Sequence, residues 1–196
     1  VVVDNTFYSP IYQRPIEDGA DIVLHSATKY LAGHNDVLAG VVVTDSADLY
    51  EKLFYNLNTT GAVLSPFDSY QLIRGLKTLS LRMERSTANA QEIVAFLEQS
   101  PAVKEVLYTG RGGMISFKVA DGKRIPHILN TLKVFSFAES LGGVESLITY
   151  PTTQTHADIP AEVRHSYGLT DDILRLSIGI EDVRDLIEDL RQALEG

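Results

Sequence analysis

The sequence predicts an α/β fold whose elements form two successive cores. Three short apolar runs, at residues 1–3, 22–24 and 37–44, are rich in β-branched residues and bounded by Asp, Gly and Asn, as in strands buried in a sheet. A helical pattern follows, and strands then alternate with helices up to the C-terminus. With 196 residues, 44% of them hydrophobic and 22% charged, the chain can bury one good core or two modest ones.

The first run, Val1 to Val3, reads as a buried strand that is already close to its C-terminal end, because Asp4 and Asn5 follow it directly. There is no initiator Met. We therefore expect the chain to be a fragment.

The helical stretch begins at Ser65, a residue type that caps helices, and Pro66 suits the first turn. Apolar residues then recur at helical spacing, with a polar break before the last four: Leu72, Ile73, Leu76, Leu79, Met83, Ala90, Ile93, Val94 and Leu97. We expect this stretch to link two domains, since the sequence beyond it has a core of its own.

The second half predicts a further sheet covered by helices. Strands are expected at residues 103–108, 114–119, 134–138, 147–149 and 173–180. A helix is expected at 125–132 with Pro126 in its first turn, and a terminal helix has an apolar stripe between residues 183 and 194.

Composition narrows the function. The 17 Lys and Arg against 26 Asp and Glu give a net charge of −9, which argues against nucleic-acid binding and favours a small-molecule substrate. No stretch approaches the roughly 20 apolar residues that cross a bilayer, and no leader opens the chain, so we expect a cytoplasmic protein.

Metal and disulfide chemistry is not expected. The chain has no cysteine, which excludes disulfides, a thiol nucleophile and thiolate zinc sites. Its five histidines lack the close spacing of metal ligands: His25, His34, His127, His156 and His165.

Lys29 is the first candidate for chemistry. It follows a predicted strand through Ser26, Ala27 and Thr28, which places it at the rim of a sheet, where ligands of open α/β folds bind. Partial burial could lower the pKa of its amine enough to make it a nucleophile, and the two hydroxyls suit phosphate oxygens. A loop lysine capped by polar neighbours remains the alternative at this point.

The order of the motifs decides between these interpretations, because together they resemble the Cys/Met-metabolism family of pyridoxal-phosphate (PLP) enzymes. The resemblance covers essentially the whole chain. Its motifs are Val3-Asp4-Asn5-Thr6, Gln13-Arg14-Pro15, Gly19-Ala20-Asp21, Ser26-Ala27-Thr28-Lys29-Tyr30, Gly33-His34, Ser65-Pro66-Phe67-Asp68, Arg74-Gly75-Leu76-Lys77-Thr78-Leu79, Glu139-Ser140-Leu141-Gly142-Gly143-Val144-Glu145-Ser146 and Arg175-Leu176-Ser177.

The resemblance implies the aspartate-aminotransferase-like fold type I. Residues 1–75 would be the C-terminal part of the PLP-binding large domain, and 76–196 the linking helix and small C-terminal domain. The family's phosphate-binding glycine loop and ring-stacking tyrosine lie upstream of this sequence. Complete members are about twice as long, and the resemblance implies a homo-oligomer, a tetramer built of dimers.

The resemblance also implies the cofactor site. Lys29 would hold PLP as a Schiff base, and Asp4 would pair with the protonated pyridine nitrogen, which keeps the ring an electron sink. Without Lys29, a strand-end Asp that caps a turn would be the simpler interpretation of Asp4. Ser26 and Thr28 would bind the cofactor phosphate.

For the substrate, the resemblance implies that Arg175 binds the α-carboxylate through its planar fork. Ser140 would fix the same carboxylate or orient Lys29. Glu139 would attract the amino group of cysteine or of the distal half of cystathionine, with solvent exposure as the plain alternative. Taken alone, a strand arginine is usually a salt-bridged surface residue.

A glutamate at position 139 favours the γ-acting enzymes of cystathionine metabolism over β-lyases and methionine γ-lyases. The stretches at 61–64 and 146–160 most resemble those of bacterial cystathionine γ-synthase and O-acetylhomoserine thiolyase sequences. This resemblance favours cystathionine γ-synthase activity, in which cysteine replaces the acyl group of an O-acylhomoserine during methionine biosynthesis. Cystathionine γ-lyase, or another lyase of the family, is the alternative. A catalytically silent PLP-fold scaffold is the alternative of another class, and the lack of a glycine-rich fingerprint after a strand excludes a nucleotide-binding protein.

Overall fold

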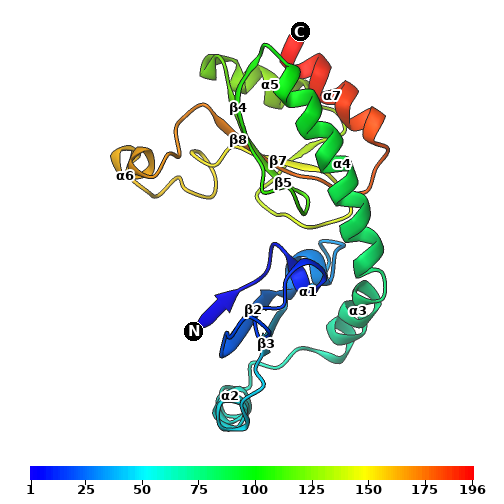
Figure 1. Ribbon diagram of the computed structural model, residues 1–196, viewed down its shortest axis with the longest axis vertical. Coiled ribbons are helices and arrows are strands. Elements are labelled where there is room, and N and C mark those ends of the chain that lie inside the picture. The colour runs from blue at the N-terminus through cyan, green and yellow to red at the C-terminus, as the bar shows by residue number, and fades with distance from the viewer. The chain divides into compact units, whose positions relative to one another are not determined.

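The computed structural model describes all 196 residues and divides into two compact units, Val1–Leu81 and Arg82–Gly196 (Figure 1). Each unit has its own sheet, which confirms the expected α/β class. We expected the domain boundary between residues 75 and 76, with the linking helix in the second domain. This boundary stays a prediction. No helix combines the length and the apolar character needed to cross a membrane.

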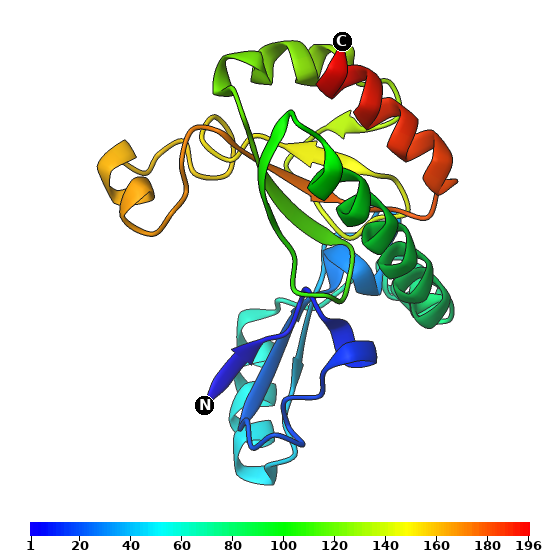
Figure 2. The ribbon, with the colours of Figure 1, turned by 45° about the horizontal axis from the view of Figure 1, so that its top comes forward.

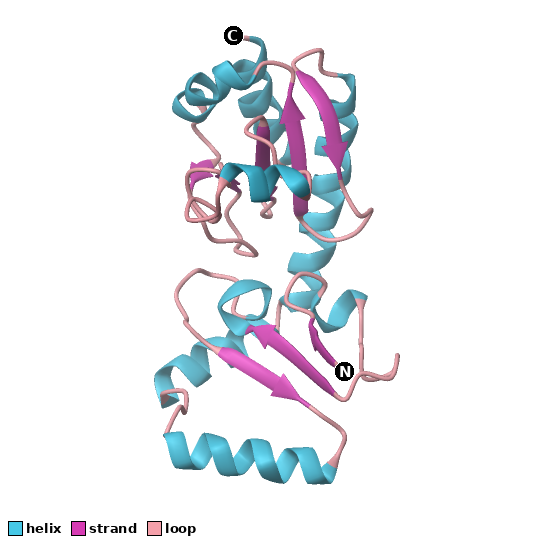
Figure 3. Ribbon diagram, turned by 90° about the vertical axis from the view of Figure 1, so that its left-hand side faces the viewer, coloured by secondary structure: helices cyan, strands magenta, loops and turns pink.

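The first unit is built on a three-stranded sheet of order β1-β2-β3, whose strands are drawn in magenta in the lower part of Figure 3. β1 (Val2–Asp4) runs parallel to β2 (Ile22–Ser26), and β3 (Gly40–Val43) runs antiparallel to β2. The short helix α1 (Ser9–Tyr12) follows β1. The parallel pair brings the carboxyl ends of β1 and β2 to one edge of the sheet.

The expectation that the first and third runs are buried is wrong. Val1 and Val2 are 77% and 60% exposed, and most of β3 is exposed too. Both are edge strands of the sheet, so only β2 has neighbours on two sides. The third strand is also shorter than residues 37–44.

Helix α2 (Ala47–Thr60) is an element that the sequence analysis did not predict. Its signals are nevertheless present: the Ser46 hydroxyl accepts a hydrogen bond from the Leu49 N–H, and Gly61 ends the helix with a φ of 67°. None of its residues is buried, and it stands clear of the sheet in Figure 3.

The predicted helical stretch from Ser65 is two helices. α3 (Pro66–Leu76) begins as expected, because the Ser65 hydroxyl accepts from the Asp68 N–H at 3.1 Å. The break falls at residues 77–78, and α4 (Leu79–Gln99) then continues without interruption through the polar segment where a break was expected. Burial every three or four residues, at Met83, Ser86, Ala90, Ile93 and Leu97, accounts for its continuity.

The second unit contains a five-stranded sheet of order β4-β5-β8-β7-β6, with β4 (Val103–Leu107), β5 (Met114–Val119), β6 (Ser136–Phe137), β7 (Leu147–Thr149) and β8 (Ile173–Ser177). β8 is antiparallel to both β5 and β7. Three helices, α4, α5 (Ile125–Thr131) and α7 (Val183–Glu195), cover one face (Figure 2). Their buried residues share one apolar core with the sheet: Ile93, Leu97, Ile115, Phe117, Ile125, Ile128, Ile148, Leu174, Leu176, Leu186 and Leu190.

All five strands and both helices predicted for this half are present. The strand expected at 134–138 is reduced to two residues, and α6 (Ala161–Ser166) was not predicted. The short η2 turn (Gly122–Arg124) leads into α5, where Pro126 lies in the first turn as expected.

Asp189 on α7 organises the connection between α5 and β6. Its buried carboxylate, 5% exposed, accepts backbone hydrogen bonds from Lys133, Val134 and Phe135 at 2.8–3.1 Å. The Gln192 amide adds a fourth donor at 2.8 Å. A buried charge is stable only with such partners, so this carboxylate fixes three consecutive peptide groups to the helix.

We predict that Asp189→Asn lowers the free energy of unfolding by about 3 kcal/mol, because the neutral amide cannot accept from all these N–H groups and leaves buried donors unsatisfied. Urea denaturation measures this. The exposed neighbour provides the control, Glu188→Gln, which should change stability by less than about 0.5 kcal/mol. Equal effects of the two substitutions would contradict the assigned role.

Candidate functional site

In the first unit, the predicted cofactor residues gather at the edge where β1 and β2 end. Asp4 is the last residue of β1, Ser26 is the last of β2, and Lys29 follows within η1 (Ala27–Leu31). The pairing of Asp4 with Leu24 aligns the two strand ends. Asp4 and Ser26 therefore end neighbouring strands at one edge of the sheet, and Lys29 follows Ser26 by three residues.

The hydroxyl of Thr6 joins the two strand ends. It donates to Asp4 Oδ1 at 2.6 Å and accepts from the Ser26 N–H at 2.8 Å. The Thr6 backbone N–H also donates to Asp4 Oδ1, at 3.0 Å. These two bonds from Thr6 lower the pKa of Asp4, the side-chain bond most, so the carboxylate is held in its charged form. The sequence analysis missed Thr6, although the Asp-x-Thr spacing is typical of an Asx turn.

Asn5 fixes the chain on the other side of Asp4. Its backbone N–H donates to the Leu24 carbonyl, and its side-chain amide donates to the carbonyls of Ser9 and Gln13. Ser9 is fully buried with a φ of 53°, a left-handed conformation that a non-glycine residue keeps only under such constraint. The turn after β1 is therefore rigidly tied to β2.

Lys29 lies in the turn η1, where its backbone (φ −90°, ψ −128°) departs from helical values and produces a kink. Gly75 of α3 packs directly against this turn: a Cβ there would lie 2.8 Å from the Leu31 carbonyl oxygen and from the Ala32 carbonyl carbon. Only glycine permits that approach, so Gly75 helps to set the position of the turn.

The two hydroxyls near Lys29 differ in their partners. Thr28 Oγ1 donates to the Ala39 carbonyl at 3.3 Å and accepts from the Ala39 N–H at 3.0 Å, which ties η1 to the start of β3. The half-buried Ser26 hydroxyl makes no hydrogen bond within the protein. Ser26 is thus the better placed of the two to bind a phosphate oxygen.

His25, on β2, is 8% exposed, and its Nδ1 has no hydrogen-bond partner. Burial lowers the pKa of His25, against a smaller opposing effect of Asp4, so the imidazole is neutral at pH 7. No group of three or more His, Asp or Glu side chains lies close enough to hold a metal ion.

The predicted substrate residues lie in the second unit, around β8. Arg175 Nη2 donates to the Glu139 carbonyl at 2.9 Å, the Ser140 carbonyl at 3.4 Å and Thr149 Oγ1 at 3.1 Å. Arg175 is thus bound to the backbone of the loop that carries the other two predicted residues. The Glu139 side chain is exposed and Ser140 is partly buried.

The continuation of β8 also holds this loop. Ser177 Oγ accepts from the Gly142 N–H at 2.8 Å. Glu181 accepts from both the backbone N–H and the hydroxyl of Ser146, at 2.5 and 2.9 Å, while Ser146 Oγ accepts from the Gly179 N–H at 2.9 Å. Residues 139–146 therefore form one hydrogen-bonded piece with the segment 175–181.

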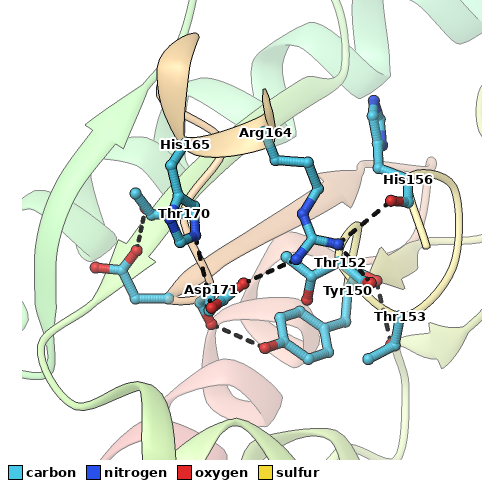
Figure 4. Close-up of polar contacts among 9 residues, drawn as sticks. Tyr150, Thr152, Thr153, His156, Arg164, His165, Thr170 and Asp171 are labelled. Carbon is cyan, nitrogen blue, oxygen red and sulfur yellow. Dashed lines mark hydrogen bonds and ion pairs between the residues drawn. The ribbon is translucent and has the colours of Figure 1, made fainter. Parts of the chain in front are cut away.

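Arg164 organises the segment that follows β7, as Figure 4 shows. Arg164 lies on α6 and is 8% exposed. Its guanidinium donates to the carbonyls of Thr152 and His156 at 3.2 and 3.3 Å and contacts Asp171 Oδ1 at 3.3 Å. The Tyr150 hydroxyl reaches the Asp171 carbonyl at 2.9 Å. This arginine was also missed, because nothing in the sequence distinguishes it from a surface charge.

The seven predicted residues thus form two clusters. Asp4, Ser26, Thr28 and Lys29 share one edge of the first unit, and Glu139, Ser140 and Arg175 share one hydrogen-bonded piece of the second. Each cluster is defined within its own unit.

Comparison with known proteins identifies the family. The family model described as Cys/Met metabolism PLP-dependent enzyme matches residues 1–195. A cystathionine gamma-synthase/O-acetylhomoserine (thiol)-lyase of Bacillus subtilis is 58% identical over 99% of the chain and 52% of its own length. A cystathionine gamma-lyase of the same organism is 51% identical over 100% of the chain and 55% of its length.

Among solved structures, a cystathionine gamma synthase from Xanthomonas oryzae, in complex with aminoacrylate and cysteine, matches 99% of the chain and 55% of its own with a TM-score of 0.95 and 44% identity. A cystathionine gamma-lyase from Micromonospora echinospora matches with a TM-score of 0.98 and 41% identity, over 100% of this chain and 56% of its own.

The fold is therefore that of the fold type I class of PLP-dependent proteins, as the sequence predicted. Within that class, the chain belongs to the Cys/Met metabolism PLP-dependent enzyme family. It spans about half the length of the curated relatives that it matches.

We predict that Thr6→Val raises the pKa of the Asp4 carboxyl, because the substitution removes the hydroxyl that most stabilises the charged form. An NMR titration of the side-chain carboxyl carbon measures the shift. Thr6→Ser retains the hydroxyl and should titrate like the parent protein. An unchanged titration in the valine variant would show that the hydroxyl does not set this pKa.

We predict that Gly75→Ala displaces the turn that carries Lys29, because the new methyl group overlaps backbone atoms, which cannot move aside as a side chain can. The amount of PLP retained by the complete protein after dialysis should fall severalfold. At Gly40 a Cβ would meet only the His25 carbonyl oxygen, at 3.9 Å, so Gly40→Ala is the matched control. Full retention by both variants would contradict the prediction.

Proposed function

We propose that this chain supplies the cofactor lysine and the substrate-binding arginine of a PLP-dependent trans-sulfuration enzyme with cystathionine γ-synthase activity. In that reaction the sulfur of cysteine replaces the acyl group of an O-acylhomoserine. One observation carries the proposal. At the carboxyl ends of the paired strands, the hydrogen-bonded carboxylate of Asp4 ends β1, and Lys29 lies in the turn that follows β2.

The residues at this edge fit PLP by their chemistry. The lysine amine suits the cofactor aldehyde, the carboxylate of lowered pKa suits the protonated pyridine nitrogen, and the Ser26 hydroxyl suits the phosphate. The Thr28 hydroxyl already donates its proton to the Ala39 carbonyl, so it can bind a phosphate oxygen only by sharing that proton. When bound, PLP supplies an electron sink that stabilises negative charge at the substrate's α carbon.

The chain's own residues then bind the substrate and move its protons. Arg175 binds the α-carboxylate through its planar guanidinium, which fixes the orientation of the α carbon. Once released from the cofactor aldehyde, Lys29 Nζ would accept the proton of the α carbon as general base and would pass it to the bound cofactor. The amine, neutral again, would then accept a proton from the β carbon, and the acyl group would leave the γ carbon as a carboxylate. Ser140 fixes the carboxylate or orients the lysine.

Glu139 supports the choice of a γ-acting enzyme. Its carboxylate is exposed and unpaired, while its backbone carbonyl is bound to Arg175. The carboxylate can therefore attract the amino group of incoming cysteine. The name of the 58% identical relative, which includes cystathionine gamma-synthase, supports the same choice.

Cystathionine γ-lyase is the second candidate. Relatives with lyase names are 50–51% identical, and a structure with that name matches with a TM-score of 0.98. We also propose amino acids as substrates and a homo-oligomer, a tetramer built of dimers, from the family resemblance. A cytoplasmic location stays a prediction.

We predict that Lys29→Ala abolishes turnover in the complete protein and leaves its far-UV circular dichroism unchanged, since the residue is needed for proton transfer and cofactor attachment. Borohydride reduction of the parent should attach PLP to the peptide that contains Lys29, as mass mapping will show. Lys52→Ala, at an exposed position of α2, should keep full turnover and labelling.

Product analysis then identifies the reaction. Cystathionine formed from an O-acylhomoserine and cysteine supports the synthase. Release of a keto acid and a thiol from cystathionine alone supports a lyase. A protein that neither binds PLP at Lys29 nor turns over either substrate would be the silent scaffold, and the proposal would be wrong.

A further inference from the structure

We infer that Thr149 is a positioning residue for Arg175. Its hydroxyl sets the plane of the guanidinium and so determines how well the site prefers a substrate with an α-carboxylate. The inference rests on the proposed role of Arg175 in binding that carboxylate.

The sheet places the two residues directly across from each other. Thr149 is the last residue of β7, and it pairs in register with Arg175 of the antiparallel strand β8. Arg175 Nη2 lies 3.1 Å from Thr149 Oγ1. Thr149 is only 1% exposed, so water cannot replace its hydroxyl as a partner.

A second hydrogen bond fixes the direction of that hydroxyl. Thr149 Oγ1 donates its single proton to the Ala138 carbonyl at 2.7 Å. Since a hydroxyl has one proton and two lone pairs, only acceptor capacity remains for Arg175. The hydroxyl therefore acts as an oriented acceptor, and a group without a lone pair at this position cannot take its place.

Thr149 is one of three acceptors that lie around Nη2. This nitrogen carries two protons, and the other two acceptors are the consecutive carbonyls of Glu139 and Ser140, at 2.9 and 3.4 Å. The hydroxyl and the two carbonyls together restrict the directions of the two N–H bonds. Because the guanidinium is planar and rigid, fixing both N–H directions at one nitrogen fixes the plane of the whole group.

The backbone of Thr149 is held without its hydroxyl. Tyr150, the next residue, donates from its N–H to Gln154 Oε1 at 2.9 Å and from its hydroxyl to the Asp171 carbonyl at 2.9 Å. Arg164 holds the segment beyond it (Figure 4). Removal of the hydroxyl alone should thus leave β7 in place and free the guanidinium, together with the Ala138 carbonyl to which the hydroxyl donates.

The experiment compares two ligands in the complete, PLP-loaded protein: L-alanine, which has the carboxylate, and L-alaninamide, which lacks it. The change in the visible absorption of the cofactor gives both dissociation constants. Thr149→Val keeps the shape of the side chain and removes the hydroxyl, Thr149→Ala removes it with less bulk, and Thr149→Ser keeps it. We expect alanine to bind about tenfold more weakly to the valine and alanine variants, with alaninamide unchanged and the serine variant like the parent.

Thr109→Val is the matched control, because the Thr109 hydroxyl also donates to a backbone carbonyl, that of Arg111, but in an exposed turn. Both of its dissociation constants should equal those of the parent. Arg175→Lys serves as the reference for complete loss of the carboxylate preference.

The outcomes separate this inference from the proposed function. If Arg175→Lys loses the preference while the valine and alanine variants keep it, the role of Thr149 is wrong and that of Arg175 stands. If Arg175→Lys keeps the preference, the proposed role of Arg175 is wrong, and the inference falls with it. Equal weakening of both ligands in the Thr149 variants would show a general structural defect and would also overturn the inference.

Discussion

The first unit depends on one hydroxyl, that of Thr6, which bonds to both strand ends at the edge of the sheet. Strands β1 and β2 are parallel, so no hairpin joins their carboxyl ends. The Thr6 hydroxyl and the bond from the Asn5 N–H to the Leu24 carbonyl hold them in register there. By donating to Asp4 and accepting from the Ser26 backbone, Thr6 gives the carboxylate a fixed direction and a low pKa at once. The turn that carries Lys29 begins directly after Ser26. The hydrogen bond to the Ser26 N–H therefore also fixes where that turn begins.

In the second unit, a single strand, β8, holds the loop 139–146. β8 has neighbours on both sides, and its chemistry is carried at alternate positions: Arg175, Ser177 and then the close approach at Gly179 all act on the loop 139–146. Period-two alternation puts Arg175 and Ser177 on one side of the strand, and Gly179 follows its end. The same strand gives Leu174 and Leu176 to the core, so the rigidity of the core passes directly to the loop.

The sequence predicted what periodicity and ordered motifs can encode. The α/β class, the Ser65 cap, the helix with Pro126 and the family all follow from local patterns, and all are confirmed. Burial of Val1 and Val2 was wrong because an apolar run does not reveal whether its strand lies at an edge. Thr6, Thr149 and Arg164 were missed because their importance comes from partners that only the folded chain brings near, 20 residues away for Thr6 and Ser26 and 26 for Thr149 and Arg175. Helix α2 was missed although its cap and αL glycine are readable.

The binding of Arg175 to the Glu139 backbone has an evolutionary consequence. The arginine recognises a carbonyl oxygen, which every amino acid possesses, and not the carboxylate beside it. Position 139 can thus mutate without losing this hydrogen bond. Under the proposed roles of the two residues, selection could change the side chain that meets the distal part of the substrate and leave the arginine that binds the α-carboxylate in place.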